Sequence, residues 1–247
     1  FTDFGFTKKT GIDMLGEQSN AGLYHGEKVL SNPDSEASLA TSAFGQTFKV
    51  TPLQVITDMS AVANGGKLMQ PYVVQKILDG DGNVVENITP TVKRQVISEE
   101  TAKRVAAMLD TAVNTGSKNA YVAGYRVAGK TGTSEKRDIK VEAGQQQEVI
   151  GSFAGFAPAD DPQIAILLMV DQPQGSMISR YGSTVAAPYA QKILAEVMPY
   201  MSIERKYTEK EVAAMDRTTP GGENTDVTAG RARLSTAGRN SEVLGSG

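Results

Sequence analysis

The sequence has no cysteine, and His25 is its single histidine. Disulfides, thiolate catalysis, iron–sulfur clusters and cysteine-based zinc sites are therefore excluded, as is a metal site with two histidine ligands from this chain. Long apolar runs are also missing, because the longest stretch without Asp, Glu, Lys or Arg covers the twelve residues from Ala37 to Phe48. No segment is long enough to span a bilayer as a helix. We expect neither a metal nor another cofactor.

An excess of positive charge is missing as well. The 247 residues include 25 Lys and Arg against 28 Asp and Glu, a net charge of -3 at pH 7. This balance argues against nucleic acid or an anionic membrane surface as a general partner. With 40% hydrophobic and 21% charged residues, the chain can form a packed core. Its length suits one large domain, alone or with a small appendage.

Capping signals predict two helices in the first half of the chain. Thr51 and Pro52 have the residue types of an N-cap and a first helical position, and Asn64-Gly65-Gly66 ends the helix. Its small and apolar residues predict burial on most sides. Ser98 caps a second helix that runs to Val113. Its expected inward-facing residues are Val105, Met108, Leu109, Ala112 and Val113.

Turn and strand signals complete the element pattern. Residues 79–83 read as a hairpin turn between a strand at 72–78 and a return strand from Val84. A last helix runs from about Pro188 to Tyr200. Residues 1–35 read as an irregular surface segment. The expected buried stripe around the last helix consists of Val185, Tyr189, Ile193, Leu194 and Val197.

Three strands are predicted at 125–133, 149–156 and 164–170. Their short, polar connections contain no helices and therefore imply antiparallel neighbours. The third strand is nearly all apolar, so we expect it at the centre of the sheet. The predicted fold class is α+β and sandwich-like, with an antiparallel sheet flanked by helices.

One segment fits two incompatible motifs. Gly124 to Thr131 satisfies the P-loop pattern, and Asp171 after an apolar strand mimics a magnesium-binding carboxylate. A P-loop Lys-Thr must open a helix whose amides hold the phosphates. Here a polar run without helical periodicity follows, so we reject an NTPase. Asp171 is interpreted as a strand-end turn residue.

The second motif is Lys-Thr-Gly on the edge strand of an antiparallel sheet, followed by another Thr. Lys130 would supply a fixed positive charge near a nucleophile and a substrate carboxylate. The Thr131 hydroxyl can bind that carboxylate, and Gly132 lets a substrate backbone approach the strand. The N–H of Thr133 can bind a developing oxyanion.

Further sequence blocks accompany this motif in a fixed order: Ala43–Gln46, Val50–Gln54, Ala63–Gly66, Gly124–Thr133, Ser152–Asp160 and Ala186–Pro188. In order and spacing they resemble the class B penicillin-binding proteins, and most closely their sporulation and division members. That family cross-links peptidoglycan stem peptides through a serine acyl-enzyme, and penicillins acylate the same serine. The resemblance implies a penicillin-binding, serine β-lactamase-like transpeptidase fold.

By this resemblance Lys130 and Thr133 are catalytic, and Thr131, Gly132 and Thr133 bind substrate, with no metal. The family also needs Ser-x-x-Lys, and no serine of this chain has Lys three residues later. Ser117-Lys118-Asn119 reads Ser-x-Asn but follows a helix in the wrong part of the chain, so we interpret it as a loop. The chain alone is therefore expected to be inactive.

The resemblance also implies a domain plan. Residues 1–200 would be the C-terminal part of a transpeptidase domain that is incomplete at its N-terminus, 201–225 a linker and 226–247 part of a PASTA module. Expected partners are stem peptides, β-lactams and other cell-wall synthesis or divisome proteins, at the extracytoplasmic face of a bacterial membrane whose anchor this chain lacks. The alternative is a non-catalytic wall-binding or scaffold protein. His25 is interpreted as a loop residue, and Arg180 and Tyr181 as candidates for a cleft border.

Overall fold

The structure is a computed structural model that describes residues 1–18, 26–46, 48–136, 139–142, 144–176 and 178–206. Residues Phe1–Lys206 form one compact unit. His25 and the predicted PASTA segment lie outside the described residues. The helical elements are α1 (Glu27–Leu30), η1 (Pro33–Ser35), α2 (Glu36–Ser42), α3 (Pro52–Ala63), α4 (Glu99–Thr111), η2 (Ala112–Ser117), η3 (Ile178–Arg180), α5 (Gly182–Val185) and α6 (Ala187–Tyr200). The strands are β1 (Lys67–Met69), β2 (Lys76–Leu78), β3 (Val84–Asn87), β4 (Val92–Gln95), β5 (Ala128–Glu135), β6 (Val149–Ala157) and β7 (Ile164–Asp171).

The main sheet has three antiparallel strands in the order β5-β6-β7. The antiparallel prediction is confirmed, and the Lys-Thr-Gly motif lies on an edge strand as expected. The prediction that the strand at 164–170 is central is wrong, because β6 occupies the centre. Two helices, α3 and α6, contact β7 from opposite faces of the sheet. These helices cover both faces of β7, which explains why its sequence is continuously apolar although it has a neighbouring strand on one side only.

The first strand of the sheet starts later than predicted, at Ala128 rather than Tyr125. The residues before it turn sharply, since Gly124 has a φ of 83° and Arg126 a φ of 46°. Left-handed backbone at a non-glycine residue is uncommon and interrupts a strand. Arg126 therefore belongs to the turn that delivers the chain into β5.

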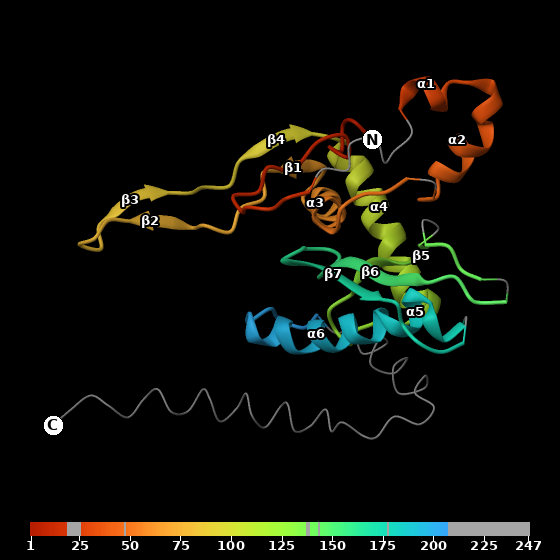
Figure 1. The fold of residues 1–247 in the computed structure, drawn as a ribbon. Helices are drawn as coiled ribbons and strands as arrows, with labels where there is room; N and C mark the ends of the chain where they lie inside the picture. The colour runs from red at the N-terminus through yellow and green to blue at the C-terminus, as the bar shows by residue number, and fades with distance from the viewer. Residues whose placement is uncertain (19–25, 47, 137–138, 143, 177, 207–247) are drawn as a thin grey trace. The chain divides into compact units, whose positions relative to one another are not determined.

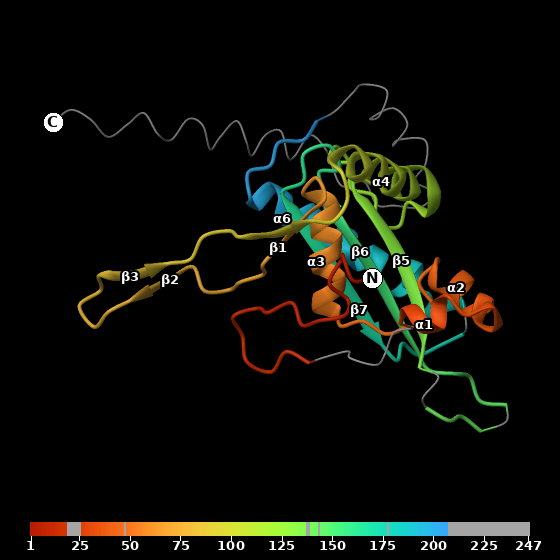
Figure 2. The same cartoon turned by 90° about the horizontal axis from the view of Figure 1, so that it is seen from above.

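Helices cover both faces of the sheet. Figures 1 and 2 show α3 and α4 on one face and α5 and α6 on the other. Phe153 of the central strand is 1% exposed and packs in one buried cluster with residues of α6. The predicted stripe of α6 is partly wrong, because Tyr189 is 56% and Ile193 42% exposed. The buried positions are Ala187, Ala190, Leu194 and Met198, where the two alanines let the helix approach the sheet closely.

The cap of α3 is confirmed. The Thr51 hydroxyl accepts the N–H of Gln54, and the Gln54 side chain accepts the N–H of Thr51, a reciprocal capping box. Burial on most sides is confirmed in part: Gln54, Asp58 and Ala61 are buried, and every other residue of the helix except Pro52 is half-buried. Gln54 is buried because its amide also donates to the carbonyls of Phe6 and Lys8, at 3.3 and 2.9 Å.

The cap of α4 is confirmed as well, because the Ser98 hydroxyl accepts the N–H of Thr101. Its inward face agrees with the prediction at Val113, which is buried, and differs from it elsewhere. Met108 is 63% exposed and Ala112 is also exposed, whereas Ala102 and Asp110 are buried. Asp110 takes an inward position because it has an arginine partner from the turn before β5.

The predicted hairpin is present as β2 and β3, although its first strand begins at Lys76 rather than Tyr72. The Asp79 carboxylate accepts the backbone N–H groups of Asp81 and Asn83 and so fixes the turn. We call residues 76–87 the hairpin arm. It projects from the rest of the unit in Figure 1, and every strand residue in it is exposed.

Within the described part of the chain, no helix is both long and apolar enough to cross a membrane. The described part of residues 1–35 is largely irregular, as predicted, but it contains two short helices, α1 and η1. A two-stranded ribbon of β1 and β4 connects the hairpin arm to the rest of the unit.

Candidate active site

The Lys-Thr-Gly-Thr motif occupies the middle of β5. Thr131 pairs with Phe153 and Thr133 with Gly151 in the register of β5 and β6. Because side chains alternate along a strand, Thr131 and Thr133 share one face, and Lys130 and Gly132 share the other. Among the described strands β5 has one neighbour only. Its outer edge therefore presents backbone groups to which an extended peptide can pair.

Lys130 is exposed, and its Nζ donates to the carbonyl oxygen of Thr131 at 3.0 Å. Within the described residues, its ammonium group forms no ion pair with a carboxylate. An ammonium group has three donors, so two remain for other acceptors. Lys130 thus places a positive charge beside the strand edge, and no carboxylate of the described residues pairs with it.

Thr133 is exposed, and its hydroxyl accepts the backbone N–H of Gly182 at 3.1 Å. Gly182 is the first residue of α5, on the helical layer beneath this face. The two threonine hydroxyls of the motif therefore lie on one face, and the second is held by a contact from outside the sheet. Sequence reasoning did not anticipate this contact.

Gly132 leaves the strand open on the other face. A side-chain carbon at this position would lie 2.7 Å from Oγ of Ser152, its partner on β6. A side chain here would require the Ser152 hydroxyl to rotate away, whereas glycine leaves room for close approach by a ligand backbone.

An ion pair fixes the turn just before the motif strand. The Arg126 guanidinium binds the Asp110 carboxylate of α4. Its Nε lies 3.3 Å from Oδ1, and its Nη2 makes a second contact with Oδ2. The Asn114 amide joins them by donating to the carbonyl of Asp110 at 2.9 Å and to that of Val127 at 3.3 Å. This group was not predicted from the sequence, because Asp110 lies outside the predicted inward face of the helix.

The other candidates have contacts of their own. Asp171 ends β7 and forms an ion pair with Lys136 at 2.5 Å. The P-loop interpretation has no structural support, because Lys130 and Thr131 continue a strand rather than open a helix. Asn119 donates to the carbonyl of Ser183 at 2.7 Å.

The two predicted cleft residues differ in exposure. Arg180 is 6% exposed and Tyr181 is 41% exposed. Only Tyr181 therefore presents much of its surface to a ligand. Arg180 instead bonds to the segment that leads into β6.

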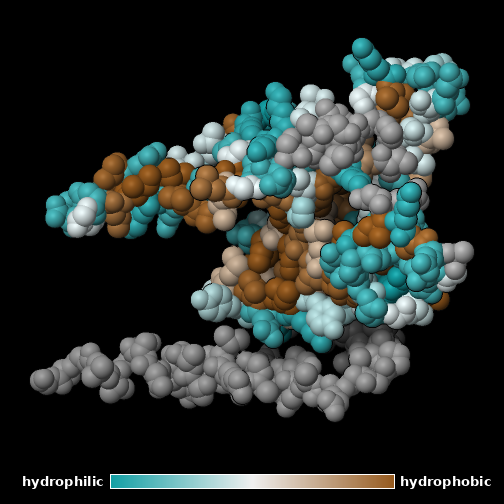
Figure 3. All heavy atoms as spheres, viewed as in Figure 1, coloured by the Kyte–Doolittle hydropathy of each residue, from teal (hydrophilic) through white to brown (hydrophobic). Residues whose placement is uncertain are grey.

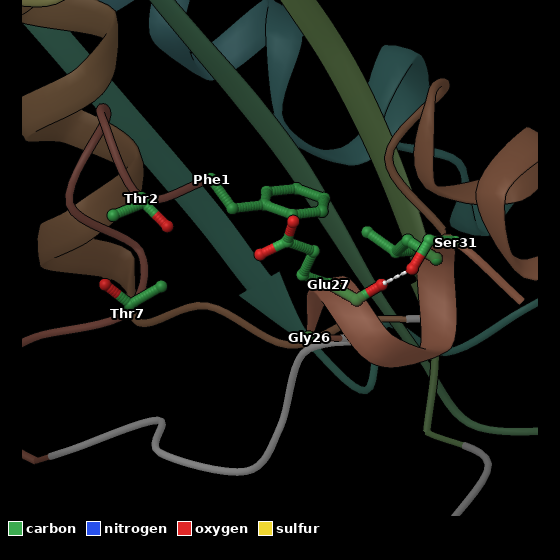
Figure 4. Close-up of a pocket in the computed structure, with 7 residues that line it drawn as sticks. Phe1, Thr2, Thr7, Gly26, Glu27 and Ser31 are labelled. Carbon is green, nitrogen blue, oxygen red and sulfur yellow. Dashed lines mark hydrogen bonds between the residues drawn. The ribbon is translucent and has the colours of Figure 1, made fainter.

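A cavity of about 410 Å³ lies elsewhere in the unit. It is lined by residues of the first loop and of α1, including Phe1, Thr7, Glu27 and Ser31 (Figure 4). No residue that lines it belongs to β5. The Lys-Thr-Gly motif therefore does not line this cavity. The described residues also contain no cluster of three or more potential metal-ligating side chains.

Comparison with known proteins relates this geometry to one family. Residues 1–195 match the penicillin binding protein transpeptidase domain. Stage V sporulation protein D of Bacillus subtilis is 40% identical over 211 residues, 85% of this chain and 31% of that protein. Peptidoglycan D,D-transpeptidase FtsI of Escherichia coli is 29% identical over 206 residues, 83% of this chain and 32% of that protein. The chain thus spans about a third of the length of these relatives.

Solved structures agree with the sequence matches. Penicillin binding protein 3 of Mycobacterium tuberculosis, complexed with aztreonam, superposes with a TM-score of 0.67 at 28% identity. The match covers 83% of this chain and 46% of that one. The predicted fold class and the predicted resemblance to sporulation and division members are both confirmed. This chain belongs to the penicillin-binding protein transpeptidase family.

Proposed function

We propose that this chain forms the Lys-Thr-Gly-bearing part of a peptidoglycan D,D-transpeptidase. The observation that carries the proposal is the placement of Lys130–Thr133 on the open edge of β5, in a unit whose family match spans residues 1–195. A stem peptide in extended form would pair with that edge. Relatives named as D,D-transpeptidases and a relative solved with aztreonam support this substrate class and β-lactams as ligands.

The proposed reaction proceeds through a serine acyl-enzyme. The serine oxygen attacks the carbonyl carbon of the D-Ala–D-Ala bond, and the terminal D-Ala leaves with the proton that completes its amino group. An amine of a neighbouring stem then attacks the ester, which forms the cross-link and restores the serine hydroxyl. The serine and its Lys are not encoded between residues 1 and 247 as Ser-x-x-Lys, so another part of the full-length protein must supply them.

Each motif residue has a proposed task in that reaction. Lys130 places positive charge near the nucleophile and the substrate carboxylate. Thr131 and Thr133 bind that carboxylate through their hydroxyls, which share one face of β5. The N–H of Thr133 stabilises the oxyanion that develops on the attacked carbonyl. Gly132 admits the substrate backbone.

Labelled penicillin tests the activity. The full-length protein should become covalently labelled, and a failure to label at any penicillin concentration would contradict the proposal. The 247-residue chain should stay unlabelled because it lacks the nucleophile. A mass increase equal to one acylated β-lactam on the purified chain would show that the nucleophile lies within it.

Replacement of Lys130 tests the site. Lys130→Ala in the full-length protein should slow acylation by at least ~100-fold, because electrostatic groups of this kind contribute ~2.7–4 kcal/mol to transition-state stabilisation. Lys103→Ala is the matched control, since Lys103 is an exposed lysine of α4 that pairs with Glu99. Equal acylation rates in the two variants would remove Lys130 from the site. Muropeptide binding without acylation would favour the wall-binding or scaffold alternative.

A further inference from the structure

The start of α5 is capped by the motif strand. The first N–H groups of a helix have no partner within the helix, and the N-cap residue Tyr181 contributes no side-chain acceptor. The N–H of Gly182 instead donates to Oγ1 of Thr133 at 3.1 Å. A hydroxyl that belongs to the proposed carboxylate site therefore also completes a helix terminus that lies 49 residues later in the sequence.

This contact determines what the Thr133 hydroxyl can do. A hydroxyl has one donor hydrogen and two acceptor lone pairs. Because the Gly182 N–H engages a lone pair, the hydroxyl hydrogen of Thr133 is left to donate to a different group. Thr133 is exposed, so that acceptor can be an anionic group of a bound ligand. The backbone of Gly182 thus orients the hydroxyl as a donor.

The approach of Gly182 to the sheet leaves no room for a side chain. A Cβ at Gly182 would lie 2.2 Å from the carbonyl oxygen of Gly132 and 2.3 Å from that of Ser152. Gly151, opposite Thr133, is equally close to α5, because a Cβ there would lie 2.4 Å from Val185. Neither glycine has a positive φ, so the requirement is for space and not for an unusual backbone conformation.

Side chains hold this segment on both sides of the contact. Arg180 is 6% exposed, and its guanidinium donates to the carbonyl of Gln147 at 3.1 Å and to the side chain of Gln146 at 2.6 Å. Both glutamines lie just before β6. On the C-terminal side of Gly182, the Asn119 amide donates to the carbonyl of Ser183 at 2.7 Å.

We propose that residues 180–183, which we call the strap, position the Lys-Thr-Gly-Thr strand, and that Gly182 aims the Thr133 hydroxyl at the substrate carboxylate. The inference rests on the proposed transpeptidase function and deepens it. Gly182 is a positioning residue, since it acts through Thr133. Its predicted effect is on recognition of the carboxylate, in addition to any effect on folding.

The test compares two ligands in the full-length protein: a penicillin and its methyl ester, which lacks the carboxylate charge. Gly182→Ala and Thr133→Val should each lower the ratio of the two acylation rates by at least about tenfold, as expected for a hydrogen bond to a charged group. The double variant should lose no more than Thr133→Val alone, because both changes remove the same interaction. An unchanged ratio in Gly182→Ala, or losses that multiply, would overturn the proposal.

Gly80→Ala is the matched control. A Cβ at Gly80 would have no heavy atom within 4 Å, and the residue has no positive φ, so the ratio in this variant should equal that of the unmodified protein. A loss in Gly80→Ala as large as in Gly182→Ala would show that the effect is not specific to the strap, and would contradict the proposal.

A second measurement does not depend on acylation. Amide hydrogen exchange of the peptide covering 128–135 in the full-length protein should be faster in Gly182→Ala than in Gly80→Ala. Equal exchange would refute the strap, even in a protein that takes up penicillin. Faster exchange in a protein that takes up no penicillin would uphold the contact with the strand, and would contradict both the transpeptidase function and the aiming of Thr133 at a substrate.

Discussion

The sheet β5–β6–β7 and the hairpin arm are both antiparallel, yet their environments are opposite. In β6, seven of nine residues are buried, because helices pack on both faces of the sheet. In β2 and β3 all strand residues are exposed. They include Ile77 at 45%, Leu78 at 46% and Val85 at 65% exposure, and Figure 3 shows apolar surface along the arm.

The difference shows that strand pairing alone does not make a rigid platform. A two-stranded hairpin alone in water is only marginally stable, whereas a sheet packed against helices is stable. Local opening is easiest where few apolar contacts are buried. The residues proposed to do chemistry lie on the packed sheet, so their geometry is maintained by the whole unit. The geometry of the hairpin arm depends instead on its own turn, which the Asp79 carboxylate fixes.

The largest effect should follow from emptying the core beneath the site. Phe153→Ala removes a side chain that is 1% exposed at the centre of the sheet. We expect a loss of about 3–5 kcal/mol in the free energy of unfolding, measured by urea denaturation of the chain. Ile77→Ala in the arm is the comparison. Similar losses in the two variants would mean that the arm is packed as tightly as the sheet.

A smaller effect should come from the turn that leads into the sheet. Arg126→Met leaves the buried Asp110 carboxylate without its guanidinium partner. Because the arginine side chain is 55% exposed, water can partly replace it, and we expect a loss of about 1–3 kcal/mol in unfolding free energy. Arg104→Met, on the exposed side of α4, should leave stability unchanged. Equal unfolding free energies in the two variants would contradict a stabilising role of the Arg126–Asp110 ion pair.

A pH-dependent effect is expected at α3, which contacts both the sheet and β1. Burial raises the pKa of Asp58 to about 7, against the opposing charges of the Phe1 amino group and Arg94. The folded state therefore holds a proton that the unfolded state releases near the ordinary aspartate pKa of 3.8. Stability from this group is fully present below that value and is lost as the pH rises toward 7 and beyond.

Asp58→Asn should remove this loss. We expect the stability of the variant relative to the unmodified chain to rise by about 1–3 kcal/mol between pH 4 and pH 8, since each pKa unit corresponds to ~1.4 kcal/mol and water screens the partly buried carboxyl. Any cost of burying the amide is the same at both pH values and cancels in this comparison. Thermal unfolding at the two pH values measures the rise, and a gain that does not depend on pH would rule out titration of Asp58 as the cause.

The smallest effect should be found in the arm itself. Val85→Ser changes a side chain that is 65% exposed on β3. Surface substitutions of this kind usually lie within about 0.5 kcal/mol, so urea denaturation should show no resolvable shift. A loss as large as that of Phe153→Ala would show that the arm is covered in solution.

Sequence reasoning succeeded where the signal is local. The cap at Thr51 depends on a partner three residues away, and the turn at Asp79 on one four residues away. The antiparallel pairing of the three strands followed from their short polar connections, and the edge position of Lys130 from its Lys-Thr-Gly motif. These features could be predicted because no distant residue is needed to specify them.

Features that depend on distant pairs were missed. The buried polar face of α3 exists because Gln54 meets carbonyls 46 and 48 residues away. The contact of Gly182 with Thr133 joins residues 49 apart. Arg126 is placed opposite Asp110 by a left-handed turn. Composition and periodicity carry no information on such pairings, and hydrophobic patterning alone assigned Met108 and Tyr189 to the core in error.

The end of the described unit has a mechanical consequence. Lys206 donates its N–H to the carbonyl of Gly124 at 2.9 Å and places its ammonium 2.8 Å from Asp160, while the Tyr125 hydroxyl donates to the carbonyl of Ile203 at 3.1 Å. Tension applied at Lys206 would load these tethers before it reached α6. The force would pass to Asp160, between β6 and β7, and to the turn at 124–126, directly upstream of the motif strand.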